Sequence, residues 1–226
     1  MDAVELHDNN ASTFRKRYDD KNSFKDRLSV WKELFKQYIG ENKSVIELGC
    51  GPGLMAKAII EMGNRLHAID GSAKMIERAK EEVGASPNIQ FTESYLSVDF
   101  LSKFQTNSFD HAVSSSVLEY IKEADGIIAE TNRILKPGGT FIFSVPNKQS
   151  LFRITETITH KLFGKPGYRK FLHTLLSEAD IMQLENKGWK VEQIIFQGEV
   201  PYYSALTGFL PNKYQKPMLL VVLRKK

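Results

Sequence analysis

The strongest chemical signal in the sequence is a glycine-rich segment with a carboxylate on either side. Residues 47–53 read Glu-Leu-Gly-Cys-Gly-Pro-Gly and follow an apolar run rich in β-branched residues. Glycines leave the backbone bare enough for a ligand to approach closely. The next apolar run, residues 66–69, ends in Asp70, and a carboxylate at a strand end can accept hydrogen bonds from a ribose diol. These residues predict a cradle for a cofactor that contains a nucleoside.

The spacing of the glycines separates the candidate cofactors. The pattern is G-x-G-x-G, whereas dinucleotide-binding proteins carry G-x-G-x-x-G, and the sequence has no G-x-x-x-x-G-K-S/T phosphate loop. Pro52 removes one backbone N–H, and Glu47 repels a phosphate but suits a positively charged amine or sulfonium. We therefore expect S-adenosylmethionine (SAM) as the cofactor. An NAD-dependent oxidoreductase is the least favoured alternative.

Alternating apolar strands and helices position this cradle. The glycine segment joins a strand to a helix, which is the first half of a βαβ unit, and the last two strands have no helix between them. We expect a doubly wound, Rossmann-like α/β sheet of seven mostly parallel strands, with the last strand antiparallel. The predicted strands are residues 44–48, 65–69, 89–92, 109–115, 140–145, 190–197 and 218–223. The predicted helices are residues 12–18, 24–39, 54–62, 72–83, 124–135 and 177–187.

The whole chain, residues 1–226, is expected to form a single domain. Residues 1–42 are expected to form an N-terminal helical cap and residues 43–147 the cofactor-binding core. A lid insertion (148–172) and a C-terminal helix and strand pair (173–226) follow. The Lys-Pro-Gly-Gly sequence at 136–139 predicts a turn, and residues 99–107 and 198–216 are expected to be loops.

Composition restricts the remaining function classes. The chain has 226 residues, a formal net charge of +4 and one cysteine, which excludes an intramolecular disulfide. The mild charge argues against a nucleic-acid partner, and the N-terminus lacks the apolar core of a signal peptide. The longest apolar run, residues 218–223, is too short to span a membrane. We expect a cytoplasmic protein, and nothing in the sequence indicates its oligomeric state.

Four blocks of the sequence, in their order and spacing, resemble a known family. They are residues 47–53 (ELGCGPG), 70–75 (DGSAKM), 109–113 (FDHAV) and 133–139 (RILKPGG). Over residues 44–197 the chain resembles the class I SAM-dependent methyltransferases, and more narrowly the small-molecule branch that includes ubiquinone-biosynthesis-type enzymes. The resemblance implies transfer of a methyl group from SAM to oxygen or nitrogen of a small organic acceptor, with S-adenosylhomocysteine as product. Carbon as the methylated atom stays open.

The same resemblance implies roles for individual residues around the cofactor. Glu47 would hold the amine of the methionine part indirectly, Asp70 would bind both ribose hydroxyls, and Met75 would pack on the adenine. The family commonly shows Gly-Asp after the third strand, whereas this chain has Glu93-Ser94. The adenine amine would then be held by Ser94 or by the main chain near Tyr95 and Leu96. The other residues expected at the cofactor are Tyr18, Gly49, Cys50, Gly51, Gly53, Gly71, Tyr95, Leu96, Ser115 and Ser116.

The acceptor side carries fewer signals. A general base is needed only if the acceptor's proton must leave early, and an imidazole suits this task near neutral pH. His67 and His111 fall inside predicted strands and are expected to be structural, whereas the resemblance places His173 beside the acceptor pocket. Glu119 and Tyr120 are the other catalytic candidates, and no metal site is expected. An RNA- or protein-modifying methyltransferase and a non-catalytic SAM-binding regulatory protein remain as alternatives.

Overall fold

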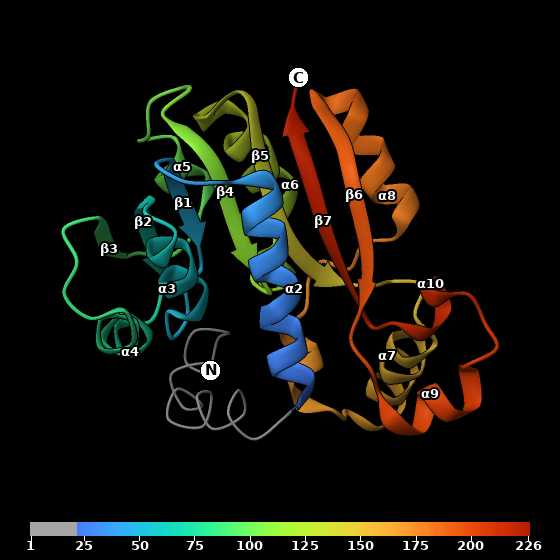
Figure 1. Cartoon of the computed structure of the whole chain (residues 1–226). Helices are drawn as coiled ribbons and strands as arrows, with labels where there is room; N and C mark the ends of the chain where they lie inside the picture. The colour runs from blue at the N-terminus through green and yellow to red at the C-terminus, as the bar shows by residue number, and fades with distance from the viewer. Residues whose placement is uncertain (1–21) are drawn as a thin grey trace.

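The protein is a seven-stranded sheet covered by helices on both faces, seen in a computed structural model that describes residues 22–226 (Figure 1). The strand order is β3-β2-β1-β4-β5-β7-β6. The first five strands pair in parallel, and β7 runs antiparallel to both β5 and β6. The predicted fold is therefore confirmed. The strands are β1 (Ser44–Leu48), β2 (Arg65–Asp70), β3 (Ile89–Glu93), β4 (Phe109–Ser115), β5 (Leu135–Pro146), β6 (Trp189–Gln197) and β7 (Met218–Lys225).

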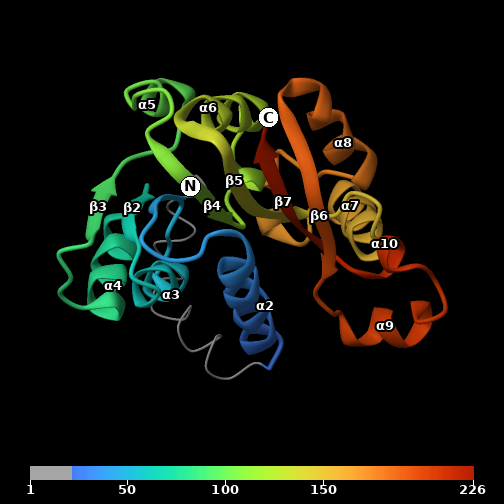
Figure 2. The same ribbon diagram turned by 45° about the horizontal axis from the view of Figure 1, so that its top comes forward.

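Two apolar clusters, one on each face of the sheet, hold the helices in place. Trp31 and Phe35 of α2 belong to the cluster that also covers α3 and α4, and Ile127 of α6 belongs to the cluster on the opposite face. Figure 2 shows the same division, with α2, α3 and α4 on one side of the sheet and α5, α6 and α8 on the other. The helices are α2 (Asn22–Tyr38), α3 (Leu54–Glu61), α4 (Ala73–Val83), α5 (Val98–Leu101), α6 (Ala124–Ile134), α7 (Leu151–Phe163), α8 (Glu178–Met182), α9 (Pro201–Thr207) and α10 (Asn212–Gln215), with the 3-10 turns η1 (Leu118–Tyr120), η2 (Gly167–Phe171) and η3 (Gln183–Lys187).

The predicted turn at residues 136–139 is wrong, because this segment is already part of β5. The register with β4 shifts between Phe109 and His111, so the Pro-Gly-Gly sequence is taken up as an irregularity within a continuous strand. A Cβ on Gly139 would lie 2.5 Å from the carbonyl oxygen of Asp110, so only glycine allows the two strands to approach this closely here. The pairs on either side of the segment, Leu135 with Phe109 and Thr140 with His111, keep it within the strand.

Three other segments differ in detail from the prediction. The expected loop at 99–107 overlaps a short helix, α5, whose first turn is capped because Ser97 Oγ accepts a hydrogen bond from Phe100 N at 3.1 Å. The expected loop at 198–216 contains α9 and α10, and the helix expected at 177–187 divides into α8 and η3. The helix expected at 12–18 lies outside the described residues. Within the described residues, no helix is both long and apolar enough to cross a membrane.

After β5 the chain leaves the sheet and comes back to pair with the end of β5 at Leu176, before α8 begins. Lys148 N donates to Leu176 O at 2.9 Å, and Leu176 N donates to Pro146 O at 3.1 Å. The buried Asn147 side chain donates to the carbonyls of Lys213 and Lys216, both at 2.8 Å. The two ends of this excursion are therefore joined by backbone pairing, and the α9–α10 region is tied to the same point.

His111 lies inside β4, where its Nδ1 is 2.7 Å from Thr140 Oγ1, and burial lowers its pKa to about 4. The unfolded chain, with a pKa near 6.5, takes up the proton first, so this contribution to stability is complete above pH 6.5 and is lost as the pH falls. Between pH 7 and pH 5 we expect it to lower the free energy of unfolding by about 2 kcal/mol.

Urea unfolding at the two pH values measures this loss, with His111→Asn as the control because asparagine keeps a polar group near the Thr140 hydroxyl. The asparagine variant is expected to lose less stability than the wild type over the same pH range. An equal loss in both proteins would show that His111 does not titrate as described.

Candidate active site

A cavity of about 820 Å³ lies at the carboxyl ends of β1, β2 and β4. In open α/β sheets, ligands bind outside the carboxyl ends of the strands, at the point where the strand order reverses. That point lies between β1 and β4 in this sheet. The cavity is lined by residues of the glycine loop, by the start of α4, by residues 94–96, 115–117 and 120–123, and by residues around η2.

The three glycines of the loop have different surroundings. Gly49 has a φ of +77°, and a Cβ there would lie 2.2 Å from Val117 Cγ2, so glycine is required where β1 passes the end of β4. A Cβ on Gly51 would meet no atom within 4 Å, so this residue presents open backbone to the cavity. A Cβ on Gly53 would lie 2.7 Å from Ala79 Cα, and Gly53 is not among the lining residues. Gly53 therefore allows α3 and α4 to pack closely.

Asp70, at the end of β2, is held in a fixed orientation by the backbone. Its Oδ2 accepts a hydrogen bond from Gly51 N at 2.8 Å, and its Oδ1 accepts one from Ser72 N at 2.9 Å. Ser72 in turn caps α4, because its Oγ accepts from Met75 N at 3.1 Å. The carboxylate lines the cavity and links the glycine loop to α4. It is thus preorganised to accept hydrogen bonds from a bound hydroxyl pair.

Glu47 is a buried carboxylate with an unused oxygen. It is 1% exposed, and its Oε2 has no hydrogen-bond partner among the described residues. Burial, and secondly the charge of Asp70, raise the pKa of Glu47 well above its usual value. An unpaired buried acceptor beside a second carboxylate favours a cationic ligand and disfavours a phosphate. The site therefore fits the positively charged methionine part of SAM.

Arg27 of α2 adds a cation to the lining of this cavity. Its Nη2 donates to the side chains of Ser115 at 2.8 Å, Ser116 at 2.7 Å and Ser144 at 3.1 Å. Ser115 and Ser116, at the end of β4, line the cavity, and Ser116 has a φ of +57°. The arginine thereby fixes α2 over the ends of β4 and β5, and its charge complements a carboxylate.

Residues after β2 and β3 form the wall expected to hold the adenine. Met75 is buried and lines the cavity, as do Ser94, Tyr95 and Leu96. Ser94 N donates to Asp70 O at 2.9 Å, which holds the chain after β3 close to the end of β2. Tyr95 is 62% exposed, so its ring is available at the rim of the cavity. Gly71 and Cys50 complete the predicted set that lines the cavity.

The other end of the cavity is built from the η1 region and the end of η2. His173 lines it together with Tyr120, and His173 N donates to Glu119 O at 2.7 Å, which joins the two segments through their backbones. The Glu119 side chain lies behind this wall, outside the lining, where burial raises its pKa to about 7. Burial, and then the Glu119 charge, also raise the pKa of Tyr120. Tyr120 therefore stays a neutral phenol.

The structure also brings residues to the cavity that the sequence reasoning did not single out. Lys122 and Glu123 follow Tyr120, and Lys170 and Phe171 precede His173. No spacing in the sequence connects these two segments, so only the adjacency of Lys122 to Tyr120 and of Phe171 to His173 could have indicated them. The predicted Tyr18 lies outside the described residues. Within residues 22–226, no group of three or more His, Cys, Asp or Glu side chains could hold a metal ion.

Comparison with known proteins identifies the domain. Residues 46–143 match the family model described as a methyltransferase domain. A ubiquinone biosynthesis O-methyltransferase of Xanthomonas oryzae pv. oryzae is 32% identical over 104 residues, which cover 46% of this chain and 43% of that protein. A malonyl-[acyl-carrier protein] O-methyltransferase 2 of Ilyobacter polytropus is 25% identical over 152 residues, 66% of this chain and 57% of that protein. The chain thus aligns with about half the length of these curated relatives.

A solved structure extends the likeness over the whole fold. The N-methyltransferase NodS of Bradyrhizobium japonicum, in complex with S-adenosyl-L-homocysteine, superposes with a TM-score of 0.71 at 18% identity. The superposition covers 100% of this chain and 99% of that protein. The strand order of the sheet, with its single antiparallel strand, is consistent with the methyltransferase domain that matches at residues 46–143. Residues 46–143 thus match a methyltransferase domain, and the fold of the chain is that of a solved SAM-dependent methyltransferase.

Proposed function

We propose that the protein transfers a methyl group from SAM to an oxygen or nitrogen atom of a small organic acceptor. The observation that carries this proposal is a single cavity that contains both a nucleoside cradle and a separate wall of aromatic, cationic and imidazole side chains. The O-methyltransferase names of the curated relatives support oxygen, although those proteins match only part of this chain.

The residues of the cradle have complementary tasks toward the cofactor. Asp70 would accept hydrogen bonds from the ribose, Glu47 would face the amine, and Arg27 would face the carboxylate of the methionine part. Met75 would pack on the adenine, and the open backbone at Gly51 leaves room for the ribose. SAM supplies an electrophilic methyl group on a sulfonium, and the two carboxylates favour that positive charge.

The wall opposite the cradle would orient the acceptor and exclude water. Methyl transfer requires the acceptor atom to approach in line with the methyl–sulfur bond, so positioning contributes much of the rate. Tyr120 and Phe171 give this wall its aromatic surface, and Tyr120 can donate or accept a hydrogen bond. His173 is the only histidine that lines the cavity in the described part of the chain, and it would accept the acceptor's proton.

The direct test uses SAM with a labelled methyl group and a panel of small phenols, carboxylic acids and amines. Label transfer to a small molecule, with formation of S-adenosylhomocysteine, is the expected result. Transfer only to RNA or protein substrates in the same assay would replace the proposal with a macromolecule-modifying activity. SAM binding without transfer to any substrate would instead favour a non-catalytic SAM-binding protein.

The unpaired carboxylate of Glu47 leads to a prediction in which stability and binding change in opposite directions. Glu47→Gln removes a carboxyl group whose raised pKa destabilises the folded state at neutral pH, so the unliganded variant is expected to unfold at a higher temperature than the wild type at pH 7. The same change removes a charge-assisted contact to the cofactor's amine and is expected to weaken SAM binding by about tenfold. Thermal unfolding and isothermal titration of both proteins measure the two effects. A variant with unchanged SAM affinity would exclude Glu47 from the amine site.

A further inference from the structure

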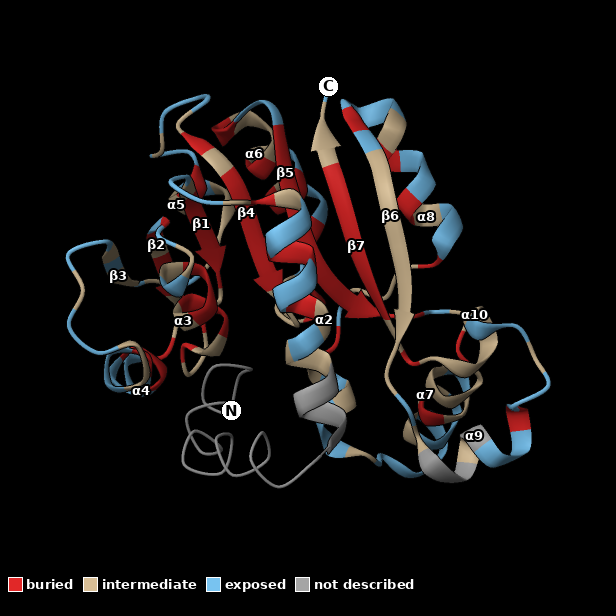
Figure 3. Ribbon diagram, in the orientation of Figure 1, coloured by how far each residue is buried: buried red, intermediate tan, exposed pale blue. Residues whose placement is uncertain are grey.

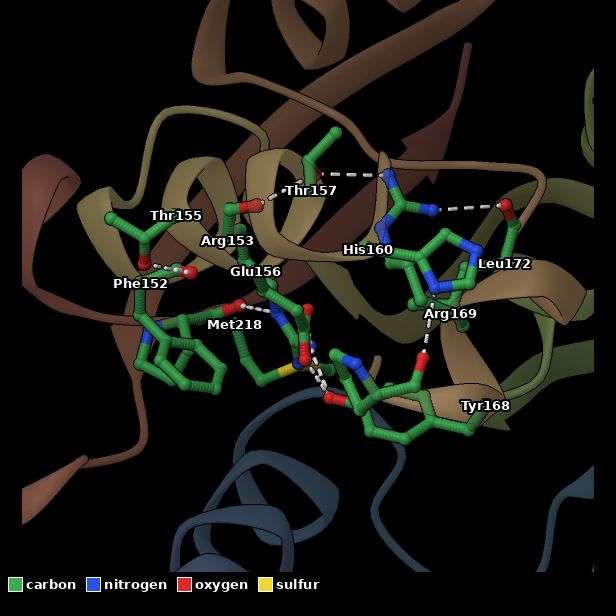
Figure 4. A network of polar contacts seen from close by, with 12 residues as sticks. Phe152, Arg153, Thr155, Glu156, Thr157, His160, Tyr168, Arg169, Leu172 and Met218 are labelled. Carbon is green, nitrogen blue, oxygen red and sulfur yellow. Dashed lines mark hydrogen bonds and ion pairs between the residues drawn. The ribbon is translucent and has the colours of Figure 1, made fainter. Parts of the chain in front are cut away.

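Helix α7 turns its polar side toward the protein, whereas an ordinary surface helix turns its apolar side inward. Its one buried residue is Glu156, whose side chain accepts a hydrogen bond from Arg153 Nη1 at 2.8 Å and another from the Tyr168 hydroxyl. Figure 4 shows Arg153, Glu156 and Tyr168 pointing toward one another between α7 and η2. Arg153 Nε also donates to Pro217 O at 3.3 Å, next to β7. The inner side of the helix is therefore charged and fully engaged.

Two further contacts fix the same inner side against η2. Arg169 Nη2 donates to Thr157 Oγ1 at 3.2 Å, and His160 Nδ1 lies 3.0 Å from Pro166 O. These contacts, drawn in Figure 4, come from a short chain segment and occupy successive turns of α7. The helix cannot rotate its polar side outward without breaking the whole network. The orientation of α7 is thus set by polar contacts.

The outer side of α7 is apolar. Ile154, Ile158 and Leu162 recur every four residues and are 41%, 52% and 69% exposed, and Phe163 at the end of the helix is 72% exposed. Ile154, Ile158 and Leu162 are called the apolar face of α7, and Phe163 is exposed next to it where the helix ends. Leu206 and Phe209, in and after the adjoining α9, are 75% and 84% exposed, and Figure 3 shows the exposed colour on part of α9 and on the chain that follows it. The α9 region is held beside α7 because Tyr203 Oη lies 2.6 Å from Thr155 Oγ1.

Most of the exposed large apolar side chains of the described residues are gathered in this one region. Six of the nine large apolar or aromatic side chains that are exposed in the described part of the chain belong to α7 or the α9 region. Single exposed apolar residues need no explanation, but a contiguous group on one helix marks a surface that is normally covered. The part of the structure that is described offers nothing that covers it.

Charge indicates what the partner is. Residues 148–172 contain six basic side chains and one acidic side chain, so this segment has a formal charge of +5, compared with +4 for the whole chain. Glu156 is buried and its charge is balanced by Arg153 at 2.8 Å, so the positive charge of the segment comes from its other five basic side chains. Lys161 and Lys165 are exposed beside the apolar face. The basic residues are Lys148, Arg153, Lys161, Lys165, Arg169 and Lys170.

We propose that the apolar face of α7 docks on an anionic lipid surface. An amphipathic helix with bulky apolar residues on one side and lysines at its border binds in the plane of a bilayer interface, through burial of the apolar side chains and attraction to anionic headgroups. The surface of a second protein copy would bury the apolar residues equally well, but two copies of this face would bring their positive charges together. The lipid surface satisfies both features, and η2 leads from it directly to Phe171 at the cavity.

The test is flotation of the full-length protein with vesicles of phosphatidylcholine alone and with vesicles that also contain phosphatidylglycerol. We expect binding to the anionic vesicles that weakens as salt is added. The double variant Ile158→Ser/Leu162→Ser is expected to lower the partition coefficient at least tenfold, because two apolar side chains no longer enter the interface. Met182→Ser is the matched control, since Met182 is 46% exposed on α8, and it is expected to bind as the wild type does.

The electrostatic part has its own variant. Lys161→Gln/Lys165→Gln is expected to weaken binding by about fivefold for each lysine on anionic vesicles, with no effect on neutral vesicles. Since the two lysine side chains are exposed, the thermal unfolding temperature of this variant is expected to equal that of the wild type. If the double variant Ile158→Ser/Leu162→Ser does not fold, Phe163→Ser is used in its place.

Three results would overturn the proposal. They are wild-type protein that does not bind anionic vesicles, apolar variants that bind as strongly as the wild type, and a dimer in sedimentation velocity that the apolar variants abolish while no vesicle binding is seen. The last result would assign the face to a second copy of the chain. None of them depends on whether the protein transfers methyl groups.

Discussion

Asp70→Ala is expected to weaken SAM binding by about 100-fold, which is the largest effect on affinity that we expect from a single substitution. The carboxylate is held by Gly51 N at 2.8 Å and Ser72 N at 2.9 Å, so it is preorganised before the ligand arrives. Hydrogen bonds to a charged group contribute about 1.5–3 kcal/mol each, and the variant loses those to the ribose hydroxyls. Isothermal titration of SAM and S-adenosylhomocysteine measures the change.

The same substitution also removes the acceptor for Gly51 N, so part of the loss could arise from a loosened loop. Asp70→Asn separates the two causes, because it keeps an oxygen acceptor while it removes the charge. Asp125→Ala is the matched control, since that side chain is 82% exposed on α6 and does not line the cavity. If Asp70→Ala binds SAM as tightly as Asp125→Ala does, the ribose is not held at the end of β2.

His173→Ala is expected to lower kcat by at least about 100-fold while SAM affinity changes less than about twofold, provided that the acceptor's proton leaves early. His173 lies at the wall formed by η1 and the end of η2, separate from the Asp70 and Glu47 side. A general base acts only in the chemical step, so its loss appears in kcat and leaves cofactor binding intact.

The measurement combines isothermal titration of SAM with steady-state kinetics on whichever acceptor takes up the labelled methyl group. His160→Ala is the control, because His160 lies on α7 near Pro166 O and does not line the cavity. A kcat for His173→Ala equal to that of His160→Ala would mean that positioning alone supports the reaction. A loss of SAM affinity in His173→Ala would place the imidazole at the cofactor instead.

Local features of the sequence predicted several residues that the structure brings together at the cavity. A strand that ends in Asp70 and a glycine loop after a strand are formed by neighbouring residues, so their geometry follows from short-range preferences. The glycine pattern alone could not show that the glycines of the loop have different structural roles. Gly51 presents open backbone, whereas Gly53 is required by Ala79 on α4, a residue distant in the sequence. That distinction depends on how two helices pack, which one stretch of sequence does not contain.

Tertiary pairing explains the other differences. The Lys-Pro-Gly-Gly segment has every local sign of a turn, yet β4 and β7 both pair with the strand that it belongs to. On α7, the recurrence of Ile154, Ile158 and Leu162 would normally indicate a buried side, and the structure turns that side outward because Arg153 and Glu156 are engaged inward. Lys122 and Lys170 both line the cavity but come from segments far apart in the sequence. Their place at the cavity could therefore not be predicted from the neighbouring residues of either one.

The segment at residues 147–176 begins and ends at the same place in the sheet, so it can be exchanged for the corresponding segment of another protein. Pro146 and Lys148 pair with Leu176 through backbone atoms, and Asn147 N donates to Pro217 O at 2.9 Å. Backbone bonds tolerate many side chains, so the enclosed residues can be lengthened, shortened or replaced by those of a relative while the sheet keeps its register. Variation in this fold can thus reshape the acceptor wall and the outer helix together, and grafting at these two points is the natural route to a chimera with a new acceptor.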